Sequence, residues 1–128
     1  MTGTPTDTLP AFLDAIERDL LRPRWEFLDE AQLHEDVASI LADYDWGDEW
    51  VLQGAGRVDF FHVPRGVAVE LKCDGNPTAV AAQLLRYADH PDVRAVVLVT
   101  SKARLGHGLP KVLRGKPLRV VNLGRSVF

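Results

Sequence analysis

Apolar residues along the chain follow two spacings, one typical of helices and the other typical of strands. Spacings of three and four residues predict helices over about residues 11–21, 29–44 and 77–88. Short apolar or alternating runs predict strands over about residues 49–53, 56–61, 67–72, 95–99 and 118–123. The run at 95–99 is apolar at every position, which is typical of a central strand buried on both faces. The last run is predicted to form an edge strand.

The order and spacing of these segments predict how the strands join. Pro64, Arg65 and Gly66 are turn residues, so they should fold the runs at 56–61 and 67–72 into an antiparallel hairpin. The helix between 67–72 and 95–99 makes a right-handed parallel crossover. The sheet is therefore mixed and the predicted fold class is α/β. We expect one globular domain over residues 10–128, preceded by a flexible N-terminus at 1–9.

The hairpin carries the candidate chemistry of this chain. Side chains alternate between the two faces of a strand, so Glu70 and Lys72 should share a face. By the same rule Asp59 should lie with Arg57 and Phe61, and the turn should bring Asp59 beside Glu70. The sequence therefore predicts that two acids and a lysine converge.

Two carboxylates on neighbouring strands repel each other unless a cation or a proton lies between them. Oxygen ligands suit Mg²⁺ or Mn²⁺, and such an ion can activate water and stabilise charge on a phosphate. Lys72 would then lie at the water or the phosphate. The alternative is a surface hairpin whose exposed face carries these charges, with an ion pair worth roughly 0–1 kcal/mol.

Asp59, a spacer and then Glu70-Leu71-Lys72 resemble the signature of the PD-(D/E)xK nuclease superfamily. Gln83 and Tyr87 match the Gln-x-x-x-Tyr element of RecB-type nucleases in that superfamily. The resemblance covers roughly residues 28–100, and Val58 stands where the family's usual proline precedes the aspartate. It implies a restriction-endonuclease-like core in the order αβββαβ, with a mixed central sheet flanked by helices.

The resemblance also implies roles for residues in this chain. Asp59, Glu70 and the carbonyl of Leu71 would bind Mg²⁺ or Mn²⁺, and Lys72 would act on the attacking water. Such nucleases usually carry another acid on the first core helix, where the candidates are Glu30, Glu35 and Asp36. At about 100° per residue, Glu30 points toward the sheet and Glu35 away from it. His34 is a further candidate metal ligand, since some RecB-type relatives use a histidine there, and Glu49 is a weaker one.

The charges of the chain are divided unequally between its two parts. The net charge is −3, but residues 1–50 hold 13 acids and 3 bases, whereas residues 51–128 hold 5 acids and 12 bases. The C-terminal part could therefore offer a basic surface to a polyanion such as nucleic acid. The candidate basic residues are Arg86, Lys102, Arg104, Lys111, Arg114, Lys116 and Arg119. The alternative is pairing of these bases with acids of the same chain.

Other features limit the class of protein. The sequence has no run of eighteen apolar residues and no signal-peptide pattern, so we expect a cytoplasmic protein without a membrane span. The single Cys73 excludes an internal disulfide and argues against an iron–sulfur set.

These observations predict a metal-dependent DNA nuclease that is structure-selective or non-specific, with Gln83, Tyr87 and Arg86 contacting the substrate backbone. A phage endonuclease or a repair or recombination enzyme would fit this description. Cutting both strands of a duplex requires two sites, which leaves a homodimer open. The alternatives are a non-catalytic nucleic-acid-binding module that retains the fold and a hydrolase of a smaller phosphate substrate.

Overall fold

The computed structural model describes residues 8–26, 29–42 and 45–124. Along the chain, two helices are followed by three strands, and then by a helix, a strand, a short helix and two strands. The helices are α1 (Leu9–Leu21), α2 (Glu30–Leu41), α3 (Pro77–Asp89) and α4 (Ala103–Gly106). The strands are β1 (Trp46–Leu52), β2 (Gly56–His62), β3 (Val67–Lys72), β4 (Ala95–Thr100), β5 (Val112–Leu113) and β6 (Lys116–Asn122). From α2 to β4 the elements follow in the order helix, three strands, helix, strand.

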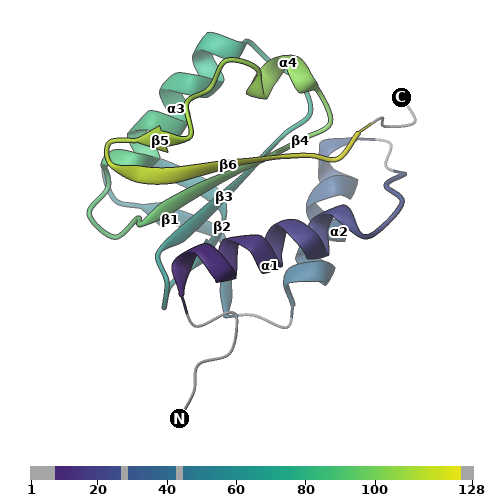
Figure 1. The fold of residues 1–128 in the computed structure, drawn as a ribbon, viewed down its shortest axis with the longest axis horizontal. Coiled ribbons are helices and arrows are strands. Elements are labelled where there is room, and N and C mark those ends of the chain that lie inside the picture. Colours follow the sequence, from purple (N-terminus) through teal and green to yellow (C-terminus); the bar gives the residue numbers. More distant parts are fainter. Residues whose placement is uncertain (1–7, 27–28, 43–44, 125–128) are drawn as a thin grey trace.

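The strands form a mixed six-stranded sheet in the order β1-β2-β3-β4-β6-β5. The pairs β1·β2, β2·β3 and β5·β6 are antiparallel, whereas β3·β4 and β4·β6 are parallel. Helices α1 and α2 cover one face of the sheet, and α3 and α4 cover the other (Figure 1). The predicted α/β class with a mixed sheet is therefore confirmed, and β4 is central as predicted.

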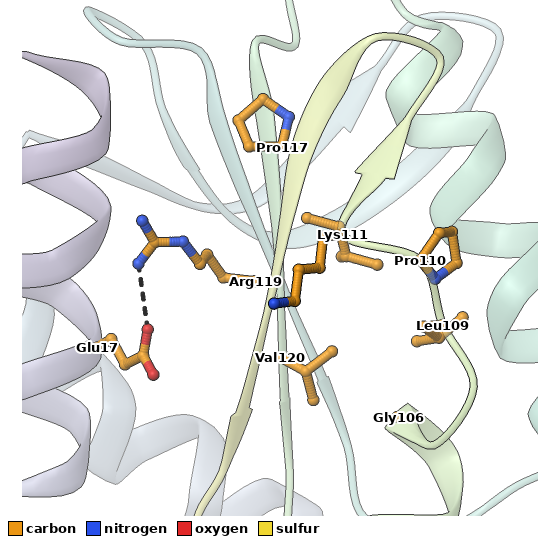
Figure 2. A pocket seen from close by; sticks show the side chains of 9 residues that line it. Glu17, Gly106, Leu109, Pro110, Lys111, Pro117, Arg119 and Val120 are labelled. Carbon is orange, nitrogen blue, oxygen red and sulfur yellow. Dashed lines mark hydrogen bonds and ion pairs between the residues drawn. The ribbon is translucent and has the colours of Figure 1, made fainter.

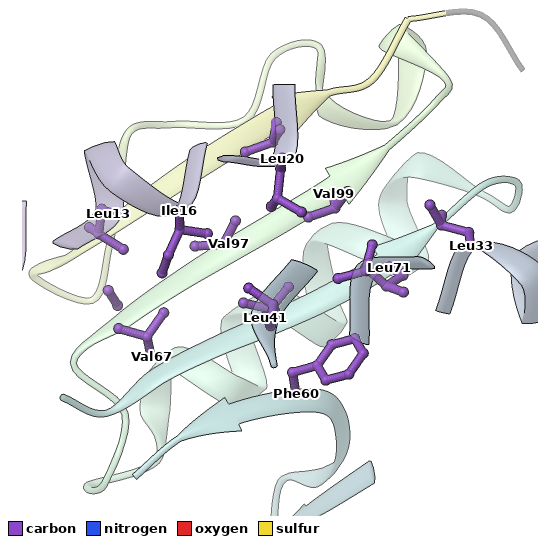
Figure 3. Close-up of a cluster of buried hydrophobic side chains, with 14 of the residues drawn as sticks. Leu13, Ile16, Leu20, Leu33, Leu41, Phe60, Val67, Leu71, Val97 and Val99 are labelled. Atoms are coloured by element: carbon purple, nitrogen blue, oxygen red, sulfur yellow. The ribbon is translucent and has the colours of Figure 1, made fainter. Parts of the chain in front are cut away.

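Each face of the sheet has its own apolar core. On the face of α1 and α2, Ile16, Leu20 and Leu33 pack against Val97 and other strand residues (Figure 3). On the opposite face, the buried residues of α3 pack against Val96, Leu98 and their neighbours. Because both faces of β3 and β4 are covered, almost every side chain of these strands is buried.

Several predicted boundaries were wrong by a few residues. Strand β1 begins at Trp46 rather than near residue 49, because its pairing with β2 extends to His62. The predicted flexible N-terminus overlaps α1, since the Thr8 side chain caps the helix by accepting a hydrogen bond from Ala11 N at 3.2 Å. Helix α2 ends at Leu41, and residues 43–44 of the predicted helix lie outside the described residues.

The C-terminal part contains two elements that the sequence pattern did not predict, α4 and β5. Strand β5 has two residues and pairs with Lys116 and Pro117 at the beginning of β6. Strand β6 was predicted as an edge strand, but it lies between β4 and β5 over that first part. Both unpredicted elements are too short to show a periodic pattern. Among the described residues, no helix is both long and apolar enough to cross a membrane.

Candidate functional site

Strands β2 and β3 separate where the two predicted acids face each other. The last paired residues before this point are Phe60 and Val69. Beyond them, hydrogen bonds to the side chains of Asp59 and Glu70 take the place of backbone hydrogen bonds between β2 and β3. Asp59 N donates to Glu70 Oε1 at 3.3 Å, and Leu71 N donates to Asp59 Oδ2 at 2.7 Å. The predicted approach of Asp59 to Glu70 is therefore observed, with each carboxylate bound to the main chain of the opposite strand.

The predicted face of Asp59 was wrong. Strict alternation would place Asp59 with Phe61, which packs in the core beneath α3. Instead Asp59 lies toward α2, where its Oδ1 is 3.6 Å from His34 Nδ1, and the same imidazole stacks on Phe60 with ring centroids 4.5 Å apart. Val58 packs with the α3-side core, so the alternation of β2 is interrupted at Asp59.

Glu70 is buried, with only 4% of its surface exposed, whereas the surface-hairpin alternative requires an exposed acid. Lys72 is half-buried, and its Nζ lies 3.7 Å from Glu70 Oε2. The Leu71 side chain packs in the α1- and α2-side core, which anchors the main chain between Glu70 and Lys72. The three predicted residues Asp59, Glu70 and Lys72 therefore form one cluster.

Burial dominates the electrostatics of the acidic pair. Loss of solvent and, to a lesser extent, the negative charge of Asp59 together raise the pKa of Glu70 to about 8, against the opposing effect of Lys72. Burial also raises the pKa of Asp59, although the hydrogen bond from Leu71 N and the nearby His34 lower it. Both carboxyl groups are harder to ionise than in water because too little positive charge lies near them. A cation bound between them would supply that charge.

Helix α2 contributes two of the predicted residues to the same end of the sheet. Glu30 Oε1 accepts a hydrogen bond from Cys73 N at 3.0 Å, immediately after the end of β3. Glu30, His34 and Asp59 line an open hollow of about 310 Å³ together with Ala31 and Glu49. The ranking of Glu30 as the sheet-facing acid agrees with this position.

The hollow contains a group of potential metal ligands that includes Glu49. One donor atom from each of His34, Glu49 and Asp59 lies within 4.8 Å of the other two. Glu49 was only a weaker candidate from sequence, yet it lies between Asp48 and Trp50, whose partners Phe60 and Val58 flank Asp59 on β2. Its backbone has a φ of 52°, which is uncommon for a residue with a side chain.

Asp48 was not predicted at all. Its Oδ1 lies 2.6 Å from His34 Nε2, so the imidazole has an aspartate at each of its two nitrogens. Asp48 and Glu49 are adjacent acids in β1, and two adjacent acids by themselves indicate only a solvent-exposed strand at the edge of a sheet. The contact joins a residue of α2 to a residue of β1, and sequence spacing does not reveal that the two lie together.

Gln83 and Tyr87 connect α3 to the strand of Asp59. Gln83 Nε2 donates to the Tyr87 hydroxyl at 2.8 Å, and that hydroxyl donates to the carbonyl of Arg57 at 2.8 Å. Tyr87 is only 1% exposed, and burial raises its pKa. The pair therefore reaches β2, the strand of Asp59, as one of its predicted roles required, and the Tyr87 hydroxyl is bound inside the protein. In this structure Tyr87 supports β2 from within the core.

The predicted basic residues are distributed unevenly and many have acidic or carbonyl partners. Arg104 contacts Asp74 at 2.6 Å and the Gly75 carbonyl at 2.8 Å, whereas the main chain of Lys102 bonds with Thr100. Arg86 is exposed on α3. The remaining contacts are Arg114 with Asp89, Lys116 with the carbonyls of Ala88 and His90, and Arg119 with Asp14 and Glu17.

A second hollow lies away from the acidic cluster. It has a volume of about 420 Å³ and lies between β6, the segment from α4 to β5, and α1. Figure 2 shows Arg119 turned toward Glu17 across its wall, where the two side chains are 3.2 Å apart. It shares no lining residue with the hollow at Asp59. Its lining is mainly apolar and its arginine is paired, so it offers less chemistry than the acidic cluster.

The cluster fits a divalent cation by the chemistry of its donors. Carboxylate oxygens of Asp59 and Glu49 and a nitrogen of His34 converge there; oxygen ligands suit Mg²⁺ and Mn²⁺, and an imidazole nitrogen suits transition metals. Glu70, which accepts a hydrogen bond from Asp59 N, is not one of these three residues. Glu30 adds a carboxylate at the rim of the hollow. Comparisons with family models, with curated proteins and with solved structures find no match for this chain.

Proposed function

We propose that this protein is a metal-dependent nuclease that hydrolyses phosphodiester bonds in DNA. The observation that carries the proposal is the close pair of half-buried Asp59 and buried Glu70 at the point where β2 and β3 separate, with the Lys72 amine 3.7 Å from Glu70. A buried acidic pair is costly, and it is retained where its charge is used. The resemblance of Asp59, Glu70 and Lys72 to the PD-(D/E)xK signature supports the same reaction.

In this proposal Asp59 and Glu70 would hold a divalent ion, together with the Leu71 carbonyl and Glu30. When bound, such an ion supplies Lewis-acid polarisation of a phosphate oxygen and lowers the pKa of a coordinated water. Hydrogen bonds from Leu71 N and Asp59 N hold the two carboxylates in place, so little reorganisation is needed. Lys72 would orient the attacking water and offset negative charge that develops on the phosphate.

The experiment is a cleavage assay on labelled single-stranded, duplex, flapped and four-way DNA with Mg²⁺ or Mn²⁺. We expect metal-dependent cleavage that falls at least about 100-fold in Lys72→Ala and Asp59→Asn, because each removes a group that acts on the reacting atoms. Asp92→Asn is the matched control, since Asp92 is an exposed acid in the loop between α3 and β4 and does not line the hollow at Asp59. The substrate cut fastest would identify the structure that the enzyme prefers.

Two results would contradict the proposal. Absence of cleavage on every substrate, with DNA binding unchanged in both variants, would leave a non-catalytic binding module. Hydrolysis of a small phosphodiester such as bis-nitrophenyl phosphate without any DNA cleavage would indicate a smaller natural substrate. Asp59→Asn keeps an oxygen for Leu71 N and removes a charge from the pair, so we expect it to remain folded and serve as a reliable inactive variant.

A further inference from the structure

We propose that Asp48 is a positioning residue that turns Nδ1 of His34 toward a metal position shared by His34, Glu49 and Asp59, and that this position prefers Mn²⁺ to Mg²⁺. The inference rests on the proposed function, because it describes the ion that the nuclease would use. It adds a residue that no motif indicates, and it names the class of ion.

The first step is the geometry of the imidazole. Asp48 Oδ1 lies 2.6 Å from His34 Nε2, which is a short charge-assisted hydrogen bond. The acceptor is a carboxylate, so Nε2 carries the hydrogen and donates. Nδ1 is then the nitrogen whose lone pair is available to an ion, and it is the one that faces Asp59 at 3.6 Å.

The second step is the rigidity of the ring. Phe60 stacks on the imidazole with centroids 4.5 Å apart and an interplanar angle of 29°. The stacking limits rotation out of the ring plane, while the Asp48 contact limits rotation within it. Because a histidine ligand is commonly held by a carboxylate at its other nitrogen, the arrangement is the expected support for a metal ligand.

The third step is convergence. Donor atoms of His34, Glu49 and Asp59 all lie within 4.8 Å of one another, and the three residues line the same open hollow. They come from α2, β1 and β2, so three separate elements place them there. The left-handed φ of Glu49 departs from strand geometry at this one residue of β1. These ligands can therefore reach one ion from three directions.

The fourth step is the choice of ion. Mg²⁺ prefers oxygen ligands and retains much of its water, whereas Mn²⁺ binds more tightly to sites that include an imidazole nitrogen. The acidic pair Asp59–Glu70 offers oxygen alone and would accept either ion. The nitrogen of His34 is therefore the feature that distinguishes Mn²⁺ from Mg²⁺ at this end of the sheet.

The test is direct measurement of ion binding by calorimetry, with Mn²⁺ and Mg²⁺ titrated separately. Asp48→Asn should weaken Mn²⁺ binding about 10- to 100-fold, whereas Mg²⁺ binding should change much less. His34→Gln should reduce the ratio of the two affinities to the same extent, and Asp48→Glu should restore part of it. The matched control is Glu35→Gln, since Glu35 is an exposed acid on the outer side of the same helix.

A spectroscopic reading separates positioning from general structural support. Imidazole nitrogen NMR with Zn²⁺ as a diamagnetic probe should show a protonated Nε2 and a coordinated Nδ1 for His34. In Asp48→Asn the Nε2 signal should move and the coordinated signal should broaden or disappear, while the thermal transition stays unchanged because Asp48 is exposed.

Mn²⁺ and Mg²⁺ affinities that are unchanged in Asp48→Asn and His34→Gln would overturn the inference. Cleavage that requires Asp59 and Lys72 but is equally active with both ions would retain the nuclease and reject the role of His34. Ion binding that follows Asp48 and His34 in a protein that cleaves nothing would retain this site and reject the nuclease.

Discussion

At the scale of single residues, Glu70 is the clearest conflict between stability and chemistry. Its carboxyl group is buried, faces another acid and has its pKa raised to about 8. The folded protein therefore binds a proton at this position more tightly than the unfolded chain does. Ionisation of Glu70, which the proposed chemistry uses, is therefore unfavourable to the folded state.

This conflict predicts a pH dependence of stability in the absence of divalent ions. Between the ordinary value of 4.5 and about 8, folded Glu70 keeps its proton while the unfolded chain releases it. The free energy of unfolding should therefore fall as pH rises through this window, by at most about 1.4 kcal/mol per pH unit. Glu70→Gln should remove this slope, measured by urea unfolding in a chelator from pH 5 to about 9.

The comparison with the variant is needed because other groups titrate in the same range. The raised pKa of Asp59 acts in the same direction as that of Glu70. Burial lowers the pKa of His62, so its contribution to stability increases as pH rises and opposes the trend. A wild-type slope no steeper than that of Glu70→Gln would show that Glu70 ionises normally in the folded protein.

At the scale of elements, the course of β1 places both a candidate ligand and an aromatic ring. Glu49 has a left-handed backbone, and the next residue, Trp50, folds its ring back over Gly47 and stacks near Phe61, with centroids 5.8 Å apart. A Cβ at Gly47 would lie 2.2 Å from Trp50 Cε3, so only glycine leaves room for the ring. Because Gly47 has no side chain, the Trp50 ring can occupy this place on β1, beside the strand of Asp59.

Gly47→Ala should destabilise the protein by about 1–3 kcal/mol, because the indole must leave its place over β1. Combining it with Trp50→Leu should recover much of the loss, since the smaller side chain avoids the contact. Urea unfolding of the wild type, both single variants and the double variant gives the coupling energy. Purely additive losses would show that the two residues do not compete for this space.

At the scale of the whole molecule, several basic residues of the C-terminal part form ion pairs with acids of the same chain. Arg119 on β6 contacts Asp14 and Glu17 on α1, at 2.7 and 3.2 Å, and so joins the acidic and basic parts of the chain. Arg104 and Arg114 also have acidic partners. The surface free to contact a polyanion is therefore smaller than the count of bases suggests.

This pairing predicts a modest salt dependence for DNA binding. The logarithm of the affinity should fall with the logarithm of salt concentration with a slope that reflects only a few phosphate contacts. Arg86→Ala should lower the magnitude of that slope by about one, because Arg86 is exposed and has no ion-pair partner within residues 8–26, 29–42 and 45–124.

The control for this measurement is Arg119→Gln, because Arg119 is already paired with two acids. Binding would be followed by fluorescence anisotropy with an inactive variant, so that the DNA stays intact. Equal changes of slope in the two variants would mean that the ion pairs of Arg119 open when DNA binds.

The sequence by itself determined the α/β class, the hairpin between β2 and β3, and the meeting of Asp59 with Glu70. These features depend on the spacing of apolar residues and on a short turn, and both can be recognised from residues that are close together in the sequence. It also ranked Glu30 above Glu35, since the direction of a side chain on a helix follows from its number.

Only the tertiary structure decided the face of Asp59, the burial of Tyr87 and the approach of Asp48 to His34. Each depends on a contact between two elements: Asp59 of β2 accepts a hydrogen bond from Leu71 N of β3, Tyr87 of α3 donates to a carbonyl of β2, and His34 of α2 contacts Asp48 of β1. The rule that side chains alternate between faces assumes regular backbone hydrogen bonds between strands. The rule fails at Asp59, where side-chain groups accept those hydrogen bonds instead. The chemistry of the candidate site depends on that irregular point, because there the carboxylates are held by the main chain and remain close together.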